Sequence, residues 1–279
     1  MEKTYSSHKL SKLLLNILML LFSATCLFPI FWIFFASMKT QQEFMLSSMA
    51  LPESINLKNY IDVFQMTNML TYIWNSLRNT ILTLGVIIIT VFPASYVLSR
   101  SKFRGRNMIY SYFILGMLIP VHALLVPMYI QFRQAGIDNQ WYTLILPYVA
   151  FGIPISIMLM ESYIKAIPRE LEDAAAIDGC GFFKTMVVII LPLAVPVIAT
   201  VAIIQFFAAW NEFSFALILV KNDALRTIPV GLNAFKGAHD INYPRFMAAI
   251  MASMIPAMLL YFSFSKRIIS GMMAGAVKG

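Results

Sequence analysis

The stretch that decides the fold is residues 185–211, TMVVIILPLAVPVIATVAIIQFFAAWN, which contains no Asp, Glu, Lys or Arg. An α-helix needs about 20 predominantly apolar residues to cross the hydrocarbon core of a bilayer. Five further windows of comparable length also lack these four residue types: 13–38, 79–99, 107–132, 139–160 and 246–265. The sequence therefore predicts an all-α membrane protein with six transmembrane helices.

The composition of the whole chain agrees with this prediction. Of its 279 residues, 59% are apolar and 12% are charged, which is about half the charged fraction of a soluble domain. Such a composition excludes a soluble enzyme, a secreted domain and a disordered protein. A transmembrane β-barrel is excluded as well, because the windows do not alternate between apolar and polar residues. Neither cysteine, Cys26 or Cys180, has neighbours typical of a metal site, so we expect none.

Basic residues are distributed unequally between the segments that connect the windows. Thirteen of the 21 Lys and Arg residues lie in four segments, which are 1–12, 100–106, 161–184 and 266–279. The positive-inside rule places these segments, and hence both termini, in the cytoplasm. The densest basic run consists of Arg100, Lys102, Arg104 and Arg106. We interpret it as a topology anchor, with a site for lipid headgroups as the alternative.

The cytoplasmic loop 161–184, ESYIKAIPRELEDAAAIDGCGFFK, contains a second signal. The spacing predicts a short helix over 168–179, because Pro168 suits a first turn and Gly179 suits a C-terminal cap. Acidic residues follow Pro168 near the positive end of the helix dipole. We interpret the helix as a docking element for another protein. The alternative is a helix that lies on the lipid surface, which its acidic first turn disfavours.

The loop and the start of the next window resemble the EAA motif of ABC importer permeases. That motif has the pattern E-A-A-x(3)-G-x(9)-I-x-L-P, and this chain matches every spacing with Asp173, Ala174, Ala175, Gly179, Ile189, Leu191 and Pro192. The one departure is Asp173, where the family has Glu. The neighbouring Glu172 is also an acid, and the sequence leaves open which of the two contacts a partner.

The resemblance implies a type I ABC importer transmembrane fold. Segment 168–179 is then the coupling helix that sits in a cleft of a cytoplasmic ATPase, and the tail near Lys278 also touches that ATPase. The expected organisation is an accessory region 1–71, a transmembrane core 72–266 and a cytoplasmic tail 267–279. The run 210–213, WNEF, and the last five residues, GAVKG, are similar to the smaller permease subunit of the maltose-type carbohydrate branch.

The expected partners follow from the same resemblance. The chain contains no G-x-x-x-x-G-K-[ST] phosphate-binding loop, so we expect it to bind no cofactor and a separate subunit to bind ATP. The family implies a second, homologous permease subunit, two copies of the ATPase and an external solute-binding protein, assembled in a bacterial cytoplasmic membrane. Nucleic acid is not an expected partner, because the net positive charge of +8 sorts by membrane side.

The end of the fifth window and the residue that follows it contain a candidate substrate path: Gln205, Trp210, Asn211 and Glu212. The helical spacing of Gln205, Ala209 and Glu212 predicts that they share one face. Aromatic rings stack on sugars, while amides and carboxylates bond to hydroxyl groups. The alternative is that Asn211 and Glu212 mark only the outer end of a helix.

The predicted function is that of a permease subunit, not an enzyme, which imports a sugar or oligosaccharide by alternating access. An ABC permease for another solute, such as a phosphorylated polyol or a peptide, is the main alternative. An ion-coupled secondary transporter is disfavoured, because His122 is the only titratable group of the usual kinds inside the six windows. A membrane-embedded enzyme is disfavoured because no suitable catalytic motif is present.

Overall fold

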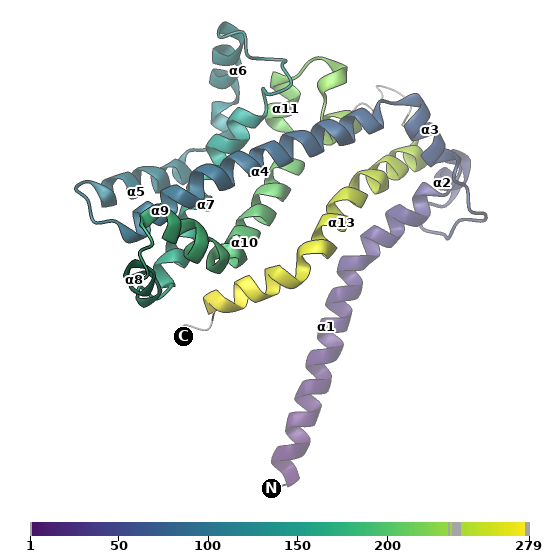
Figure 1. Ribbon diagram of the computed structural model, residues 1–279. Coiled ribbons are helices and arrows are strands. Elements are labelled where there is room, and N and C mark those ends of the chain that lie inside the picture. Colours follow the sequence, from purple (N-terminus) through teal and green to yellow (C-terminus); the bar gives the residue numbers. More distant parts are fainter. Residues whose placement is uncertain (1, 234, 236–240, 277–279) are drawn as a thin grey trace. The chain divides into compact units, whose positions relative to one another are not determined.

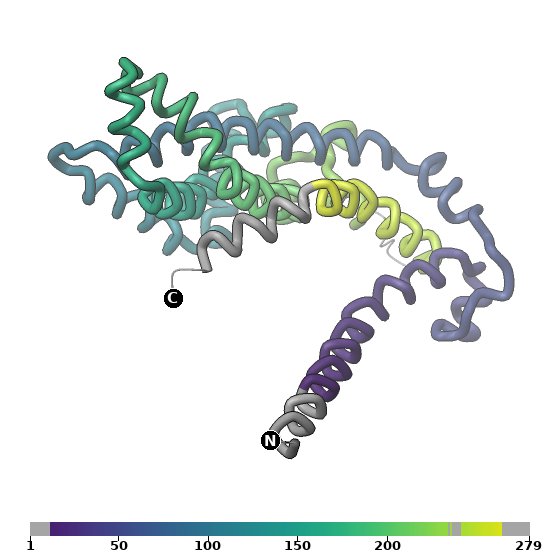
Figure 2. Tube along the Cα trace, turned by 60° about the horizontal axis from the view of Figure 1, so that its bottom comes forward, coloured from purple at the N-terminus to yellow at the C-terminus, as the bar shows by residue number. Residues whose placement is uncertain are grey.

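The computed structural model describes residues 2–233, 235 and 241–276, with side chains for 12–233, 235 and 241–263. Every regular element in these residues is helical, as Figures 1 and 2 show from two directions. The chain divides into two compact units. The N-terminal unit comprises Met1–Thr67 and Ala234–Met254, and the core unit comprises Asn68–Asn233 and Ile255–Gly279.

The N-terminal unit contains α1 (Glu2–Ser37), α2 (Gln41–Leu46), α3 (Lys58–Met66) and the beginning of α13 (Tyr243–Ala276). The apolar part of α1, Lys12–Ser37, is long enough to span a membrane and is not buried by the rest of the chain. Such a helix requires lipid around it, because water does not solvate a continuous apolar surface of this size favourably. Two polar contacts organise the shorter elements: a capping box formed by Thr40 and Glu43 begins α2, and Arg245 pairs with Asp62 at 2.8 Å.

The core unit holds the remaining elements, in the order α4 (Met69–Arg100), α5 (Arg106–Leu115), η1 (Gly116–Leu118), η2 (Val121–Leu124), α6 (Leu125–Gln134), α7 (Ile145–Ala166), α8 (Glu170–Ile177), α9 (Phe182–Thr185), the π-helical turn η3 (Met186–Ile190), α10 (Leu191–Trp210), α11 (Ser214–Leu219), η4 (Asp223–Leu225) and α12 (Ile228–Asn233). Both views place the C-terminal end of α4 together with α8 and α9 at one end of this unit (Figures 1 and 2).

The centre of the core unit is the packing of α4 against α7 and α10. Its buried side chains include Ile87 and Tyr96 from α4, Ile157 and Met160 from α7, and Val197 from α10. Gly152 allows α7 to approach its neighbours closely. A Cβ atom on Gly152 would lie 2.6 Å from the Cδ1 atom of Ile87 and 2.7 Å from the Oε1 atom of Gln205, so no larger residue fits unless these side chains move.

The third predicted span differs from the expectation of one helix over 107–132. Among the described residues, five single helices are long and apolar enough to cross a membrane: Lys12–Ser37, Met69–Arg100, Ile145–Ala166, Phe182–Trp210 and Tyr243–Ser263. The remaining candidate is a pair of segments, Arg106–Leu118 and Val121–Gln134, bent by 84°. The break includes Pro120, whose ring and missing N–H interrupt a helix. Counting the bent pair as one span gives the predicted six.

Candidate functional site

The loop that follows α7 forms the predicted short helix, with slightly different ends. Helix α8 spans Glu170–Ile177, within the predicted 168–179, and Arg169 occupies the N-cap position. Gly179 adopts a left-handed conformation with φ of +78°. The N–H groups of Gly179 and Cys180 donate to the carbonyls of Ala176 and Ala175, which is the Schellman arrangement that ends a helix. The helix therefore has a defined stop where the sequence predicts one.

Glu172 is held against the C-terminal end of α4. Its carboxylate forms an ion pair with the Arg100 guanidinium, and the Tyr96 hydroxyl donates to its Oε2 atom at 3.0 Å. Arg100 also donates from Nη2 to the carbonyl oxygen of Ile167, at 2.8 Å. The Arg100 side chain is only 6% exposed and that of Glu172 only 17%. We call Tyr96, Arg100 and Glu172 the α4–α8 anchor.

The segment after α8 also contacts the anchor. The ring of Tyr96 lies 4.8 Å from that of Phe182, centroid to centroid, at the start of α9. The last turn of α4 thus contacts the chain before α8 through Ile167, within α8 through Glu172, and after α8 through Phe182.

The opposite side of α8 faces outward. Asp173 and Ala174 are exposed, as are the apolar side chains of Leu171 and Ile177, whereas Ala175 is buried. The Asp173 carboxylate has no hydrogen-bond or ion-pair partner within the described part of the chain. Consecutive residues of an α-helix point about 100° apart, and here that rotation directs the two adjacent acids to different surroundings.

The remaining motif residues lie where α9 leads into α10. Ile189 belongs to the π-helical turn η3, and Leu191 and Pro192 occupy the first two positions of α10. Proline has no N–H to donate and clashes with the carbonyl four residues earlier, which favours a change of hydrogen-bonding pattern immediately before it. The motif thus includes a local widening of the helix, a feature that often occurs at functional sites.

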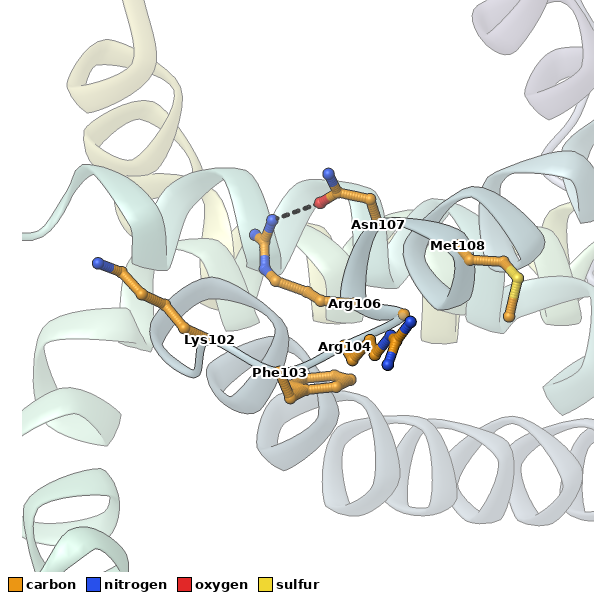
Figure 3. Close-up of a pocket in the computed structure, with 7 residues that line it drawn as sticks. Lys102, Phe103, Arg104, Arg106, Asn107 and Met108 are labelled. Carbon is orange, nitrogen blue, oxygen red and sulfur yellow. Dashed lines mark hydrogen bonds between the residues drawn. The ribbon is translucent and has the colours of Figure 1, made fainter.

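A second buried ion pair lies beside the anchor. Arg106, the first residue of α5, contacts Glu161 of α7 at 2.7 Å and donates to the carbonyl of Leu98. Figure 3 shows its further hydrogen bond to Asn107. An open depression of about 470 Å³ lies at the connection between α4 and α5. It is lined by Lys102, Phe103, Arg104, Gly105, Arg106, Asn107 and Met108. The four residues of the predicted basic run therefore have different surroundings. Arg100 and Arg106 each form an ion pair with a glutamate of this chain, whereas Lys102 and Arg104 are exposed.

The candidate substrate-path residues are only partly open. Gln205 is buried and donates from Nε2 to the Gly152 carbonyl and the Ser156 hydroxyl, both at 3.0 Å. Trp210 is buried and stacks on Phe206. These contacts join α10 to α7 and stabilise the end of α10, so the two side chains do not line an open surface within this chain.

Asn211 and Glu212 lie beyond the end of α10. Asn211 is exposed and donates to the Phe207 carbonyl. Glu212 accepts hydrogen bonds from the backbone N–H groups of Phe215 and Ala216, at 2.7 and 3.1 Å, and from the Tyr148 hydroxyl at 2.9 Å. A carboxylate that accepts the free N–H groups at a helix start acts as a cap. Glu212 therefore stabilises the start of α11 from a position just before the helix, and Asn211 is the most accessible member of the set.

Two further expectations concern metals and the C-terminal tail. The described residues contain no group of three or more His, Cys, Asp or Glu side chains that could hold a metal ion. Lys278, predicted to touch a partner, lies outside the described residues.

The anchor partners of Glu172 are what sequence reasoning missed. The sequence predicts Arg100 to be part of a topology anchor or, alternatively, of a site for lipid headgroups, and it does not relate Tyr96 to the loop. Tyr96 and Arg100 are four residues apart, so the sequence does indicate that they share one face of a helix. Nothing in the sequence shows that this face meets α8.

The sequence matches a known family over most of its length. The family described as the binding-protein-dependent transport system inner membrane component matches residues 87–273. The chain is 35% identical to the trehalose/maltose transport system permease protein MalG of Thermococcus litoralis, covering 97% of this chain and 98% of that protein. It is 34% identical to the sulfoquinovosyl glycerol transport system permease protein SmoH of Agrobacterium fabrum, covering 91% and 89%.

A solved structure shows the same fold. The matched chain comes from a bacterial ABC transporter involved in the import of the acidic polysaccharide alginate; the TM-score is 0.82 at 22% identity, covering 93% of this chain and 97% of that one. The predicted all-helical ABC permease fold is thereby confirmed. With the family match, these likenesses establish that the chain belongs to the binding-protein-dependent transport system inner membrane components and is a multi-pass ABC importer permease without catalytic activity of its own.

Proposed function

We propose that the chain is one of two homologous permease subunits that import a sugar or oligosaccharide across a bacterial cytoplasmic membrane. Several relatives carry names of carbohydrate importers, for trehalose and maltose, sulfoquinovosyl glycerol and diacetylchitobiose. One similar structure is an alginate transporter in complex with a periplasmic protein bound to an alginate pentasaccharide. In the proposed assembly, a solute-binding protein delivers the sugar outside, and two copies of a P-loop ATPase bind ATP inside.

The observation that carries the proposal is the exposed side of α8. Asp173, Ala174, Leu171 and Ile177 present an acid, a small residue and two larger apolar side chains on one short helix. A small residue lets another backbone approach closely, and a free carboxylate offers a charged hydrogen-bond acceptor. We propose that this surface docks into the ATPase and that Asp173, rather than Glu172, makes the charged contact.

The proposed mechanism is alternating access. Closure of the ATPase dimer displaces α8, and the helical core changes from open toward the cytoplasm to open toward the outside. This chain forms and breaks no covalent bonds. Both termini are proposed to lie in the cytoplasm, in agreement with the basic segments at each end. Asn211 follows the end of α10 and is the most exposed of the proposed substrate-path residues.

Co-purification of an ATPase tests the docking proposal. The tagged chain is extracted in mild detergent as wild type, as Asp173→Lys and as Glu53→Lys, a matched charge reversal at another exposed acid. We expect a P-loop ATPase and a second permease with the wild type and the Glu53 variant, and no ATPase with Asp173→Lys. If Asp173→Lys retains the ATPase in wild-type amount, the assigned contact is wrong. If a stable wild type brings down no ATPase, the proposed docking of an ATPase on this chain is wrong.

Uptake by cells that express this chain together with the proposed second permease, ATPase and solute-binding protein tests the substrate class. Trehalose, maltose and diacetylchitobiose serve as carbohydrate probes, and glycerol 3-phosphate represents a phosphorylated polyol. We expect uptake of at least one carbohydrate that requires ATP and persists when a protonophore collapses the proton gradient. Uptake of glycerol 3-phosphate alone favours the alternative ABC permease, and uptake that is lost with the gradient favours ion coupling.

A further inference from the structure

We propose that Arg100 and Tyr96 act as positioning residues which, through Glu172, make α8 and the C-terminal half of α4 move as one body. A displacement of α8 then passes directly to α4, rather than only along the chain into α9 and α10. The source of that displacement, a docked ATPase, rests on the proposed function. The mechanical link itself rests on contacts within this chain.

The geometry of the anchor favours a rigid link. Tyr96 and Arg100 lie four residues apart on α4 and therefore share one face of that helix. The Arg100 guanidinium contacts both the Glu172 carboxylate within α8 and the Ile167 carbonyl that precedes α8. The delocalised charge of one guanidinium thus attracts the carboxylate while a separate N–H group donates to the carbonyl. One side chain of α4 thus fixes two points of the α8 segment.

The burial of the anchor distinguishes it from a surface ion pair. Exposed pairs are weak because water and salt screen them and their long side chains remain mobile. Both side chains of this pair are largely removed from water, at 6% and 17% exposed, and the Tyr96 hydroxyl satisfies the second carboxylate oxygen. Loss of one partner would leave a buried charge without compensation, so separation of α8 from α4 is strongly disfavoured.

The covalent route out of α8 is less suited to carrying a displacement. The chain leaves α8 through Gly179 in a left-handed turn and then passes through η3, a π-helical turn. Glycine and π-turns are points where a backbone adjusts easily. Helix α4, by contrast, is one helix of 32 residues that continues through its internal Pro93, and it packs on both α7 and α10. A shift of α4 therefore reaches the centre of the core unit.

The experiment measures the distance between α8 and α4 by electron spin resonance. Nitroxide labels are placed at the exposed positions of Lys102→Cys and Asp178→Cys, with Cys26→Ser and Cys180→Ser as background. The purified complex in nanodiscs is measured without nucleotide and after trapping with ATP and vanadate. The anchor variant is Glu172→Gln. Glu170→Gln, an exposed acid of the same helix, and Arg104→Gln, an exposed neighbouring arginine, are matched controls.

We expect one narrow distance population in the wild type and both controls, unchanged by trapping. Glu172→Gln should lose this population to a broader one that shifts when the complex is trapped. The proposal is overturned if Glu172→Gln matches the wild type in both states, or if the wild-type distance itself changes on trapping. The nucleotide-free measurement depends only on this chain, so it tests the link between α4 and α8 even if no ATPase co-purifies. The absence of an ATPase would count against the proposed function and not against the link.

Two further variants separate a loosened anchor from a misfolded protein. Arg100→Met/Glu172→Gln removes both charges and leaves no buried charge unpaired, so it should remain folded while showing the broad distance population. Tyr96→Phe keeps the ring against Phe182 but removes the hydroxyl, and it should broaden the distances less. A stable double variant that retains the narrow population would show that the ion pair does not join the two helices.

Discussion

Replacement of Glu161 by glutamine should destabilise the core unit more than any nearby surface substitution. Glu161 lies on α7 and pairs with Arg106 at the start of α5, 2.7 Å away. Its side chain is 7% exposed and that of Arg106 is 23% exposed. Glutamine keeps the size of the residue but removes its charge, so the partly buried Arg106 is left without its ion-pair partner.

The magnitude follows from the burial of the pair. Two unit charges about 4 Å apart at an effective dielectric constant near 20 interact by about 4 kcal/mol, and breaking a buried pair on one side costs about 3–5 kcal/mol. Water reaches part of Arg106, and its bond to the Leu98 carbonyl remains, so we expect a loss of about 2–3 kcal/mol. Lys165, 4.0 Å from Glu161 and 62% exposed, forms a surface pair that contributes less than about 1 kcal/mol.

The measurement is reversible unfolding in mixed micelles, followed by circular dichroism as denaturing detergent is added. Glu161→Gln is compared with Glu53→Gln, an exposed acid, and with Arg106→Gln/Glu161→Gln. The double variant should be less destabilised than the sum of its single variants, because the two residues interact. A change within about 0.5 kcal/mol for Glu161→Gln, the range of surface substitutions, or strictly additive effects would refute the reasoning.

Three further predictions use the same unfolding assay. Gly152→Ala should cost about 1–3 kcal/mol through overpacking, since its Cβ atom would meet two side chains closer than 3 Å; an unchanged midpoint would contradict this. Gly179→Ala should cost about 1–2 kcal/mol, because alanine disfavours a φ of +78°, and Gly181→Ala is its control. The hydrogen bond from Asn68 lowers the pKa of the Asp223 carboxyl, so its contribution is present above the unfolded-state pKa and is lost as the pH falls through the folded-state pKa. Asp223→Asn should make the free energy of unfolding fall less steeply as the pH is lowered. The same fall in the variant and in the wild type would contradict this prediction.

Much of the fold could be predicted from short stretches of the sequence. The helical membrane architecture follows from windows without charge, because lipid cannot satisfy backbone groups and forces each spanning segment to bond within itself. The ends of α8 follow from short-range rules as well, since Gly179 permits the left-handed turn that closes the helix. The bend after α5 was not predicted, although Pro120 was visible, because neighbouring helices decide whether a membrane helix continues past a proline.

The candidate substrate path shows the limit of such reasoning. Gln205 and Glu212 were grouped by helical spacing as residues that could meet a sugar. The structure gives Gln205 partners on α7 and gives Glu212 the backbone N–H groups of α11. A polar side chain near the membrane must find partners somewhere, and the spacing alone does not tell a partner in the same chain from a bound solute.

The sequence by itself determined the class of the protein, the positions of its spans, and the short acidic helix with its fixed-spacing motif. The tertiary structure alone decided that Glu172 turns inward to Arg100 and Tyr96 while Asp173 remains exposed. The physical reason is range. Apolar length and capping act between residues a few positions apart, whereas α4 and α8 are distant in the chain, and only their packing selects which of two adjacent acids becomes a buried partner.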